Sequence, residues 1–314
     1  MTNSKAETIV VTGAAGLLGA AVARKLKDRG DDVIAIDRTG GHSIDGLDVI
    51  RCDLTEIHRL HELTRKGVSA IIHCGAYSGP MVARDEPYSM VQVNIVGTAN
   101  MLEIARIHQA RRFVFCSSTS AYGHIALPEG GRIGEDSPLK PESLYGASKV
   151  ASEYLVESYA KQYGVDGVSA RISWVYGPRR TTDCVIRTML TDALHRRPTR
   201  MPFGSDFHRQ FIHIDDAANG LIRALDAPTL PRRTYNITGG SRVTFSQIAE
   251  IVRAVVPEAD IQLQAGPDCL DESQGLFDIS AAQRDLGYSP QVSLEAGIER
   301  YAAWLRQQST TTGG

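Results

Sequence analysis

A tyrosine and a lysine stand one helical turn apart in the segment YGASK, as Tyr145 and Lys149. Residues four apart in a helix share one face, so this phenol and this ammonium can meet. A free tyrosine has a pKa near ~10 and is a poor base at neutral pH, but a lysine ammonium within a few ångströms stabilises the phenolate and lowers that pKa. The spacing therefore predicts a pair for general acid–base catalysis.

Hydroxyl side chains gather at the end of a predicted strand, Phe113–Ser117, in the run CSSTSAYG that begins at Cys116. The carboxyl ends of the strands of an open α/β sheet form the edge at which ligands bind. A hydroxyl at this edge can hydrogen-bond a substrate oxygen that lies beside the tyrosine. We therefore expect this run to contribute to the same site as the tyrosine and the lysine.

Three glycines, Gly13, Gly16 and Gly19, stand between the predicted strand Thr8–Thr12 and the helical segment Gly16–Arg29. Glycines at this place let the strand turn sharply and let backbone N–H groups approach a pyrophosphate at the helix N-terminus. The spacing is G-x-x-G-x-x-G, not the G-x-G-x-x-G of ordinary dehydrogenases. Because it lies between a strand and an amphipathic helix, it predicts a dinucleotide-binding loop.

An acidic residue, Asp37, closes the predicted strand Asp32–Asp37, twenty-four residues after Gly13. Its carboxylate would accept hydrogen bonds from the adenosine ribose and repel a 2′-phosphate, which favours NAD over NADP. Arg38 complicates this preference, because a guanidinium there could stack on adenine or tolerate the phosphate. Asp53, after the third strand, is either a contact to the adenine edge or a solvated carboxylate at a strand end.

The composition excludes several partners. The 314 residues are 22% charged and 42% apolar, with a formal net charge of -2. This balance gives no electrostatic reason to expect nucleic acid or an anionic membrane as a partner. No apolar run approaches the ~20 residues that span a bilayer, and the polar start of the chain does not resemble a signal peptide. We expect a cytoplasmic enzyme that acts on a small molecule.

No metal site is expected. The five cysteines are far apart in the sequence and odd in number, which suits small buried residues in a reducing compartment better than a disulfide framework. His58 and His61 share a helix face, but the surrounding sequence is typical of a solvated helix.

Strands and helices alternate through the first two-thirds of the chain, which predicts an α/β fold with a Rossmann-type, doubly wound parallel sheet. After Tyr176 prolines and glycines break the chain into loops and short elements, which predicts a smaller C-terminal substrate-binding lobe. We expect an NAD-binding domain at 1–176, to which some later segments return, a substrate lobe at 177–308 and a disordered tail at 309–314. The predicted strands are Thr8–Thr12, Asp32–Asp37, Asp48–Cys52, Ala70–Cys74, Phe113–Ser117 and Val168–Ile172, with helices at Gly16–Arg29, Tyr88–His108 and Leu144–Tyr163.

Taken together, these motifs resemble one family, the extended short-chain dehydrogenases/reductases, which include nucleotide-sugar epimerases and dehydratases. The resemblance runs from about Thr8 to Tyr301 and rests on several ordered motifs. They are TGAAGLLG, Asp37, HCGA from His73, VNIVGTAN around Asn94, SSTSAYG, YGASK, RISWVYGPR and RQFIHIDDAA.

The resemblance implies a role for each matching residue. Tyr145 would be the acid/base, Lys149 its activator and an anchor for the nicotinamide ribose, and Ser118 the catalytic hydroxyl. Asn94 would be a structural or water-positioning polar group, or equally a helix residue bonded to backbone. The cofactor contacts expected are Gly13, Gly16, Leu17, Leu18, Gly19, Asp37, Arg38, Asp53, Leu54, Ala76, Asn94, Ser117, Tyr145 and Lys149.

Departures from the family pattern narrow the reaction. Dehydratases of the family carry an Asp-Glu pair after the catalytic hydroxyl residue, where this chain has Thr119 and Ser120, so a dehydratase is not expected. Arg209 stands where the family carries an arginine for a pyrophosphate, and Arg179 is a second candidate for that role. The run 179–182 could instead bind a smaller anionic group, or equally be a solvated loop. The segment 265–272 has three carboxylates and no cation, which argues against a nucleotide diphosphate.

Two reactions remain open. The first is oxidation of a secondary alcohol, or reduction of the ketone, of a sugar-like or hydroxy-acid substrate by NAD. The alternative is a nucleotide-sugar 4-epimerase of the UDP-hexose type with tightly bound NAD; a non-catalytic NAD sensor is the third hypothesis. We expect a homodimer formed through Tyr88–His108 and Leu144–Tyr163, and substrate contacts from Ser118, Thr119, Trp174, Arg179 and Arg209.

Overall fold

A computed structural model describes residues 7–44, 46–79, 81–82, 85–125, 131–268 and 272–311. Its centre is an eight-stranded sheet in the order β13-β8-β6-β5-β1-β2-β4-β3. The strands from β13 to β4 run parallel, and β3 pairs antiparallel at the edge. They are β1 (Thr8–Thr12), β2 (Asp32–Asp37), β3 (His42–Ile44), β4 (Leu47–Arg51), β5 (Ala70–His73), β6 (Arg112–Ser118), β8 (Gly167–Ile172) and β13 (Thr234–Ile237).

The strand order reverses between β1 and β5. From β1 the chain first adds strands β2 and β4 on one side, and later adds β5, β6, β8 and β13 on the other side. A doubly wound sheet opens a crevice at the carboxyl ends of the two strands that flank this reversal. The central strands are buried on both faces and are rich in Val, Ile and Ala, as expected of a parallel sheet covered on both sides. The predicted α/β, Rossmann-type fold is therefore confirmed.

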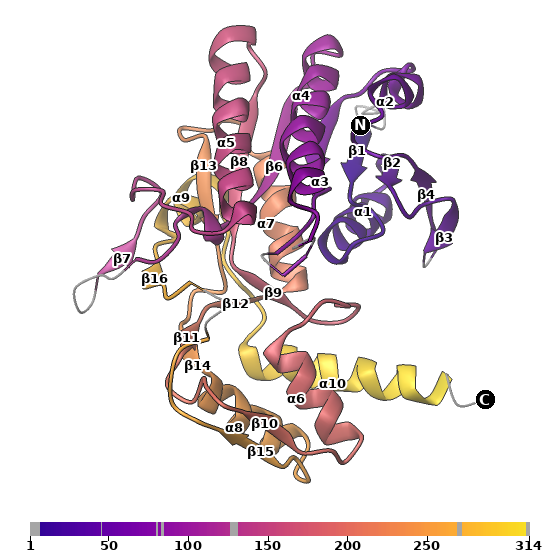
Figure 1. The fold of residues 1–314 in the computed structure, drawn as a ribbon. Coiled ribbons are helices and arrows are strands. Elements are labelled where there is room, and N and C mark those ends of the chain that lie inside the picture. Colours follow the sequence, from indigo (N-terminus) through magenta and orange to yellow (C-terminus); the bar gives the residue numbers. More distant parts are fainter. Residues whose placement is uncertain are drawn as a thin grey trace.

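Helices cover both faces of the sheet (Figure 1). One face packs against α1 (Leu17–Arg29), α7 (Ile214–Asp226) and α9 (Ser280–Leu286), and the other against α2 (Ile57–Thr64), α4 (Gly97–Ile107) and α5 (Leu144–Tyr163). The second face also receives α3 (Pro87–Val91) and the π-helical turn η1 (Gln92–Val96), which lead into α4. None of the described helices is both long and apolar enough to cross a lipid bilayer.

A smaller lobe with its own apolar core lies beyond the carboxyl edge of the sheet (Figure 1). Its helices are α6 (Val185–Leu194), α8 (Phe245–Val255) and α10 (Leu294–Thr311). The segments α7, β13 and α9 follow α6 in sequence but pack in the sheet layer. Helix α10 extends into the predicted tail as far as Thr311, and 312–314 lie outside the described residues.

Short strand pairs lie outside the central sheet. The pairs are parallel β9 (Trp174–Tyr176) with β12 (Phe211–His213), antiparallel β11 (His208–Arg209) with β14 (Val243–Thr244), parallel β10 (Thr199–Met201) with β15 (Ile261–Leu263), and parallel β7 (Arg132–Ile133) with β16 (Leu276–Phe277). The 3-10 turn η2 (Thr119–Ala121) follows β6. Because β9 follows β8 directly, one continuous segment passes from the sheet into the wall of the lobe.

A buried ion pair fastens α5 to the sheet. The Arg171 guanidinium on β8 donates to both carboxylate oxygens of Glu153, with the shortest N···O distance at 2.6 Å, and both side chains are less than a tenth exposed. Arg171 also donates to the Tyr122 hydroxyl at 2.8 Å, and Ser117 donates its hydroxyl proton to Glu153. The charges are therefore matched and hydrogen-bonded, as burial requires.

Substitution of Glu153 by Ala should lower the free energy of unfolding by about 3–5 kcal/mol, because it leaves the buried Arg171 guanidinium without its counter-charge. Glu157 lies one turn further along the same helix in an exposed pair with Lys161, so Glu157→Ala should change stability by less than about 1 kcal/mol. Urea unfolding of both variants measures the contrast. Equal effects would show that the buried pair contributes no more than the exposed one.

Candidate active site

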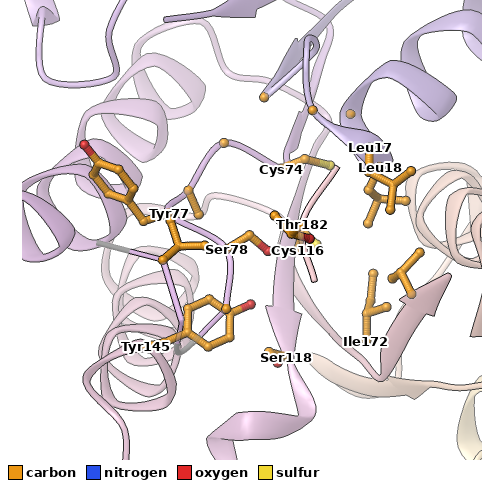
Figure 2. Close-up of a pocket in the computed structure, with 18 of the residues that line it drawn as sticks. Leu17, Leu18, Cys74, Tyr77, Ser78, Cys116, Ser118, Tyr145, Ile172 and Thr182 are labelled. Atoms are coloured by element: carbon orange, nitrogen blue, oxygen red, sulfur yellow. The ribbon is translucent and has the colours of Figure 1, made fainter. Parts of the chain in front are cut away.

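A cavity of about 370 Å³ opens at the carboxyl edge of the sheet, where its strand order reverses (Figure 2). Most of the residues predicted to contact the cofactor line it, and they come from the ends of β1, β2, β4, β5 and β6 and the starts of α1 and α5. These residues are Gly13, Gly16, Leu17, Leu18, Gly19, Asp37, Arg38, Asp53, Leu54, Ala76, Ser117, Tyr145 and Lys149. Among the described residues no group of three or more His, Cys, Asp or Glu side chains could hold a metal ion.

The glycine loop has no room for side chains. A Cβ on Gly13, which has a φ of +69°, would lie 2.8 Å from the backbone nitrogen of Gly75. A Cβ on Gly19 would lie only 2.1 Å from the Gly13 carbonyl oxygen. Helix α1 begins directly after Gly16, which offers no side chain to cap its first N–H groups. The close backbone and the open helix N-terminus fit a pyrophosphate, as the sequence predicts.

The acidic residue at the end of β2 is held beside this loop. One oxygen of Asp37 accepts the backbone N–H of Ala15 at 3.1 Å, and the other accepts the backbone and hydroxyl of Thr39. Arg38 next to it stacks on the ring of Tyr77 at 4.6 Å and donates to its hydroxyl. The Arg38 guanidinium thus has an aromatic partner from the loop after β5, a contact that sequence spacing offered no means of expecting.

Asp53 lines the cavity, but its carboxylate also shapes a turn. One oxygen accepts the backbone N–H and the hydroxyl of Thr55 at 2.9 and 2.7 Å, just before α2 begins. Its contact to an adenine edge stays a prediction.

Tyr145 and Lys149 lie in the first turns of α5. The helix begins after Ser143, whose hydroxyl accepts the Gly146 backbone N–H at 3.1 Å. Both side chains are buried, and the Lys149 ammonium lies 5.6 Å from the centre of the Tyr145 ring. It donates to the Cys116 carbonyl oxygen at 2.7 Å, which fixes it beside β6. The predicted pair therefore meets on one helix face.

Ser118 ends β6 across the cavity from the tyrosine. Its hydroxyl accepts the Ser120 backbone N–H at 3.1 Å and so begins the turn η2. Figure 2 shows the Tyr145 hydroxyl directed into the cavity, with Ser118 at the end of the neighbouring strand. A substrate oxygen placed between them would meet a phenol and a hydroxyl at once, which is the arrangement required for proton transfer during oxidation of an alcohol.

Asn94 has a structural position. Its amide bridges the backbone N–H and carbonyl of Tyr77 and donates to the Ser148 hydroxyl at 2.9 Å. It is 2% exposed and is not among the described residues that line the cavity. Of the two roles left open for this residue, its contacts match the structural one: it fastens the loop after β5 to α5, one residue before Lys149.

Arg209 lies next to the cavity in a small adjoining pocket that shares Thr119, Ser173 and Trp174 with it. Its guanidinium is buried, stacks 4.0 Å from the centre of a Trp174 ring and donates to Asp268 at 3.0 Å. The carboxylate-rich segment predicted to repel a diphosphate therefore supplies a counter-charge to Arg209. Residues 269–271 of that segment lie outside the described residues.

The residues of the run 179–182 that line the cavity differ from the one that was predicted to contact the substrate. Arg180, Thr181 and Thr182 line the cavity, whereas Arg179 is not among the described residues that do. The Arg180 guanidinium stacks on Trp174 at 5.5 Å and donates to the Asp183 carbonyl at 2.9 Å. Arg179 adopts a φ of +74°, and burial lowers the pKa of its guanidinium. Its predicted substrate contact remains a prediction.

Some residues that line the cavity were not predicted from the sequence, although they follow strands that were predicted. Tyr77 and Ser78 follow β5, and Ser173 follows β8. The predicted parallel order could have pointed to them, because all such strand ends meet at one edge.

Comparison with known proteins assigns this geometry to a family. The model of the NAD dependent epimerase/dehydratase family matches residues 9–238. The chain belongs to this family. The predicted resemblance, the predicted enzyme class and NAD as the cofactor are thereby confirmed.

Three relatives show how far the similarity extends. UDP-glucuronate 4-epimerase 4 of Arabidopsis thaliana is 29% identical, over 95% of this chain and 75% of its own. The UDP-glucose 4-epimerase of Thermus thermophilus, solved with NAD, is 26% identical with a TM-score of 0.83, covering 95% and 99% of the two chains. The UDP-glucuronic acid 4-epimerase of Bacillus cereus, solved with UDP-glucuronic acid and NAD, is 26% identical with a TM-score of 0.82, covering 96% and 99%.

A buried histidine makes stability depend on pH. His73 lies between the hydroxyls of Thr12 (2.7 Å) and Thr98 (3.1 Å), and Thr98 donates its own proton to the Asn94 carbonyl. Nε2 of His73 must therefore carry the proton, and Nδ1 must accept from Thr12. Complete burial, aided by the Lys149 charge, lowers the pKa of His73 to about 3.

The unfolded chain binds a proton at this histidine near pH ~6.5 and the folded chain does not, so stability falls as the pH drops below that value. His73→Gln should remove about 2 kcal/mol of the loss in unfolding free energy between pH 7 and pH 5. Urea unfolding of both proteins at the two pH values measures this difference. An unchanged pH dependence in the variant would mean that His73 is protonated in the folded protein.

Proposed function

We propose that the protein is a nucleotide-sugar 4-epimerase of the UDP-hexose type, which keeps its NAD bound and inverts one carbinol carbon of a UDP-sugar. One observation carries the proposal: the cavity that contains Tyr145 shares Thr119, Ser173 and Trp174 with an adjoining pocket that is lined by the buried Arg209. A nucleotide sugar with its sugar beside the tyrosine would direct its diphosphate toward Arg209. The similarity to UDP-glucuronate and UDP-glucose 4-epimerases over nearly the whole chain supports the same choice.

The catalytic residues act on the hydroxyl of the reacting carbon. Tyr145 removes the hydroxyl proton, and the Lys149 ammonium, 5.6 Å from the centre of the Tyr145 ring, stabilises the negative charge that the phenol carries. Ser118 hydrogen-bonds the same oxygen and holds it near the phenol. NAD held at the glycine loop and Asp37 would supply a hydride acceptor and donor for this carbon. Tyr145 then gives the proton back, so that no net oxidation results.

The same cavity offers groups for the rest of the sugar. Thr181 and Thr182 present hydroxyls, and Arg180 is held beside them by its contacts to Trp174 and Asp183. A uronate carboxylate could accept hydrogen bonds from these threonines. This supports a substrate of the UDP-glucuronate kind.

We also propose a homodimer. Helices α3, α4 and α5 expose large apolar side chains on the face that they present to solvent. Exposed aromatic residues on neighbouring helices are typical of a surface that a second copy covers. They are Tyr88, Tyr154 and Tyr163.

The protein as purified should contain NAD and convert UDP-glucuronate to its 4-epimer without added cofactor and without releasing NADH. Tyr145→Phe should lower turnover by about 10²-fold or more and keep its NAD, because only the proton transfer is lost. Tyr154→Phe, an exposed tyrosine of the same helix, is the matched control and should leave turnover unchanged.

Nuclear magnetic resonance of the sugar measures the conversion to the 4-epimer, and absorbance measures any release of NADH. Accumulation of free NADH with a sugar, uronate or hydroxy-acid substrate would instead identify a dehydrogenase. Full activity of Tyr145→Phe would remove the tyrosine from the mechanism.

Asp268→Asn should tighten the binding of UDP by about tenfold, because the neutral amide no longer repels the diphosphate or competes for Arg209. Arg209→Met should weaken UDP binding, while NAD binding changes in neither variant. Isothermal titration calorimetry with UDP and with uridine separates the diphosphate from the nucleoside. If neither variant alters the affinity for UDP, the diphosphate does not lie at Arg209.

A further inference from the structure

Two cysteines lie side by side in the floor of the cofactor cavity. In the parallel pair β5–β6, His73 is opposite Phe115, so the residues that follow them, Cys74 and Cys116, are opposite each other. Both pack on the sheet face covered by α1 and α7, so their side chains point the same way. Both line the cavity, and Figure 2 shows them at its floor.

The strands hold the two cysteines at a separation that a disulfide can span. Neighbouring strands lie about 4.8 Å apart, and disulfides join Cα atoms that are roughly 4.4–6.8 Å apart. A third thiol at the cavity, Cys52, follows β4, and strands β2 and β1 separate it from β5. The geometry therefore favours one pair.

The surroundings of the two thiols shift their pKa values in opposite directions. The hydrogen bond from Cys74, together with the Lys149 charge, lowers the pKa of the Cys116 thiol despite its burial. The same hydrogen bond and burial raise the pKa of the Cys74 thiol. The thiolate is the nucleophile in oxidation, so Cys116 reacts first and Cys74 resolves the product.

We propose that Cys74 and Cys116 are a peroxide-sensitive dithiol that closes to a disulfide when the cofactor cavity is empty. The Cys116 thiolate attacks hydrogen peroxide: an S–O bond forms, the O–O bond breaks, and the released hydroxide takes up the proton that Cys116 gave up. Cys74 sulfur then attacks the sulfenic acid, the S–S bond forms, and the departing hydroxide takes the Cys74 proton. Two thiols are oxidised and one peroxide is reduced to two waters.

The disulfide would act on cofactor binding through the glycine loop. A Cβ at Gly13 would already lie 2.9 Å from the Cys74 carbonyl, so the two backbones touch. Drawing Cys74 toward β6 shifts this contact and lowers the affinity for NAD. Bound NAD in turn covers the floor of the cavity and shields the thiols.

The test first removes bound NAD from the full chain, then treats it with hydrogen peroxide with and without NAD added back, and maps the peptides by mass spectrometry after alkylation. Without added NAD we expect a Cys74–Cys116 peptide lighter by two hydrogen atoms and restored by a dithiol reductant. NAD at ten times its Kd leaves about one-eleventh of the protein free, so the rate of oxidation should fall about tenfold.

Cys52→Ser is the matched control, since it removes a cavity thiol outside the pair and should leave the linked peptide in place. Cys74→Ser should convert the product to an over-oxidised Cys116. The proposal is overturned if both thiols stay open to alkylation, if Cys116 over-oxidises in the wild type while Cys74 stays free, or if Cys74 pairs with Cys52. Because the readout is a mass, these outcomes are independent of whether the protein is an epimerase.

Discussion

Backbone-to-backbone contact between the turn after β1 and the end of β5 is the constraint on which the site depends. Side chains are excluded at Gly13 and Gly19, and a Cβ on Gly75 would lie 2.8 Å from a Leu54 methyl carbon. The Thr12 hydroxyl bridges the two strand ends by accepting the Gly75 N–H and bonding His73. The phosphate loop and the loop that carries Ala76 therefore move as one unit.

This unit is connected to α5 by hydrogen bonds between uncharged groups. From His73 the chain of contacts passes through Thr98 to Asn94, whose amide reaches Ser148. Ser148 is the residue before Lys149, so the cofactor loop and the acid–base pair share one rigid support. On its other side the same helix is fixed by the charged pair of Glu153 and Arg171. The helix that carries Tyr145 and Lys149 is thus fixed by two separate sets of contacts.

Local motifs predicted the cofactor half of the site because each motif carries its own geometry. A strand, a glycine loop and a helix place a pyrophosphate whatever follows them, and residues four apart place Tyr145 beside Lys149. The substrate half depends on contacts between distant segments, and these have no local signature. Asp268 was interpreted as a repulsive charge, but the fold brings it to Arg209, 59 positions away in the sequence. For the same reason the sequence did not show that Arg180, rather than the expected Arg179, lines the cavity.

The comparisons also favour the epimerase reaction over the dehydrogenase reaction, which the three carboxylates of the segment 265–272 had suggested. Composition and spacing cannot separate the two reactions, because both begin with the same proton and hydride transfer at one carbon. They differ in whether the oxidised intermediate leaves the site or is reduced again on its other face.

The last parallel strand of the sheet, β13, reaches its place beside β8 from the C-terminal half of the chain, with Thr234 opposite Ser169. During synthesis, β8 must therefore wait with one row of N–H and C=O groups unpaired until the chain has been extended through Ile237. At about 5–20 residues per second this interval lasts several seconds, and open strand edges are templates for pairing with other chains. The nascent protein is most exposed to aggregation in that interval, before the substrate lobe is complete.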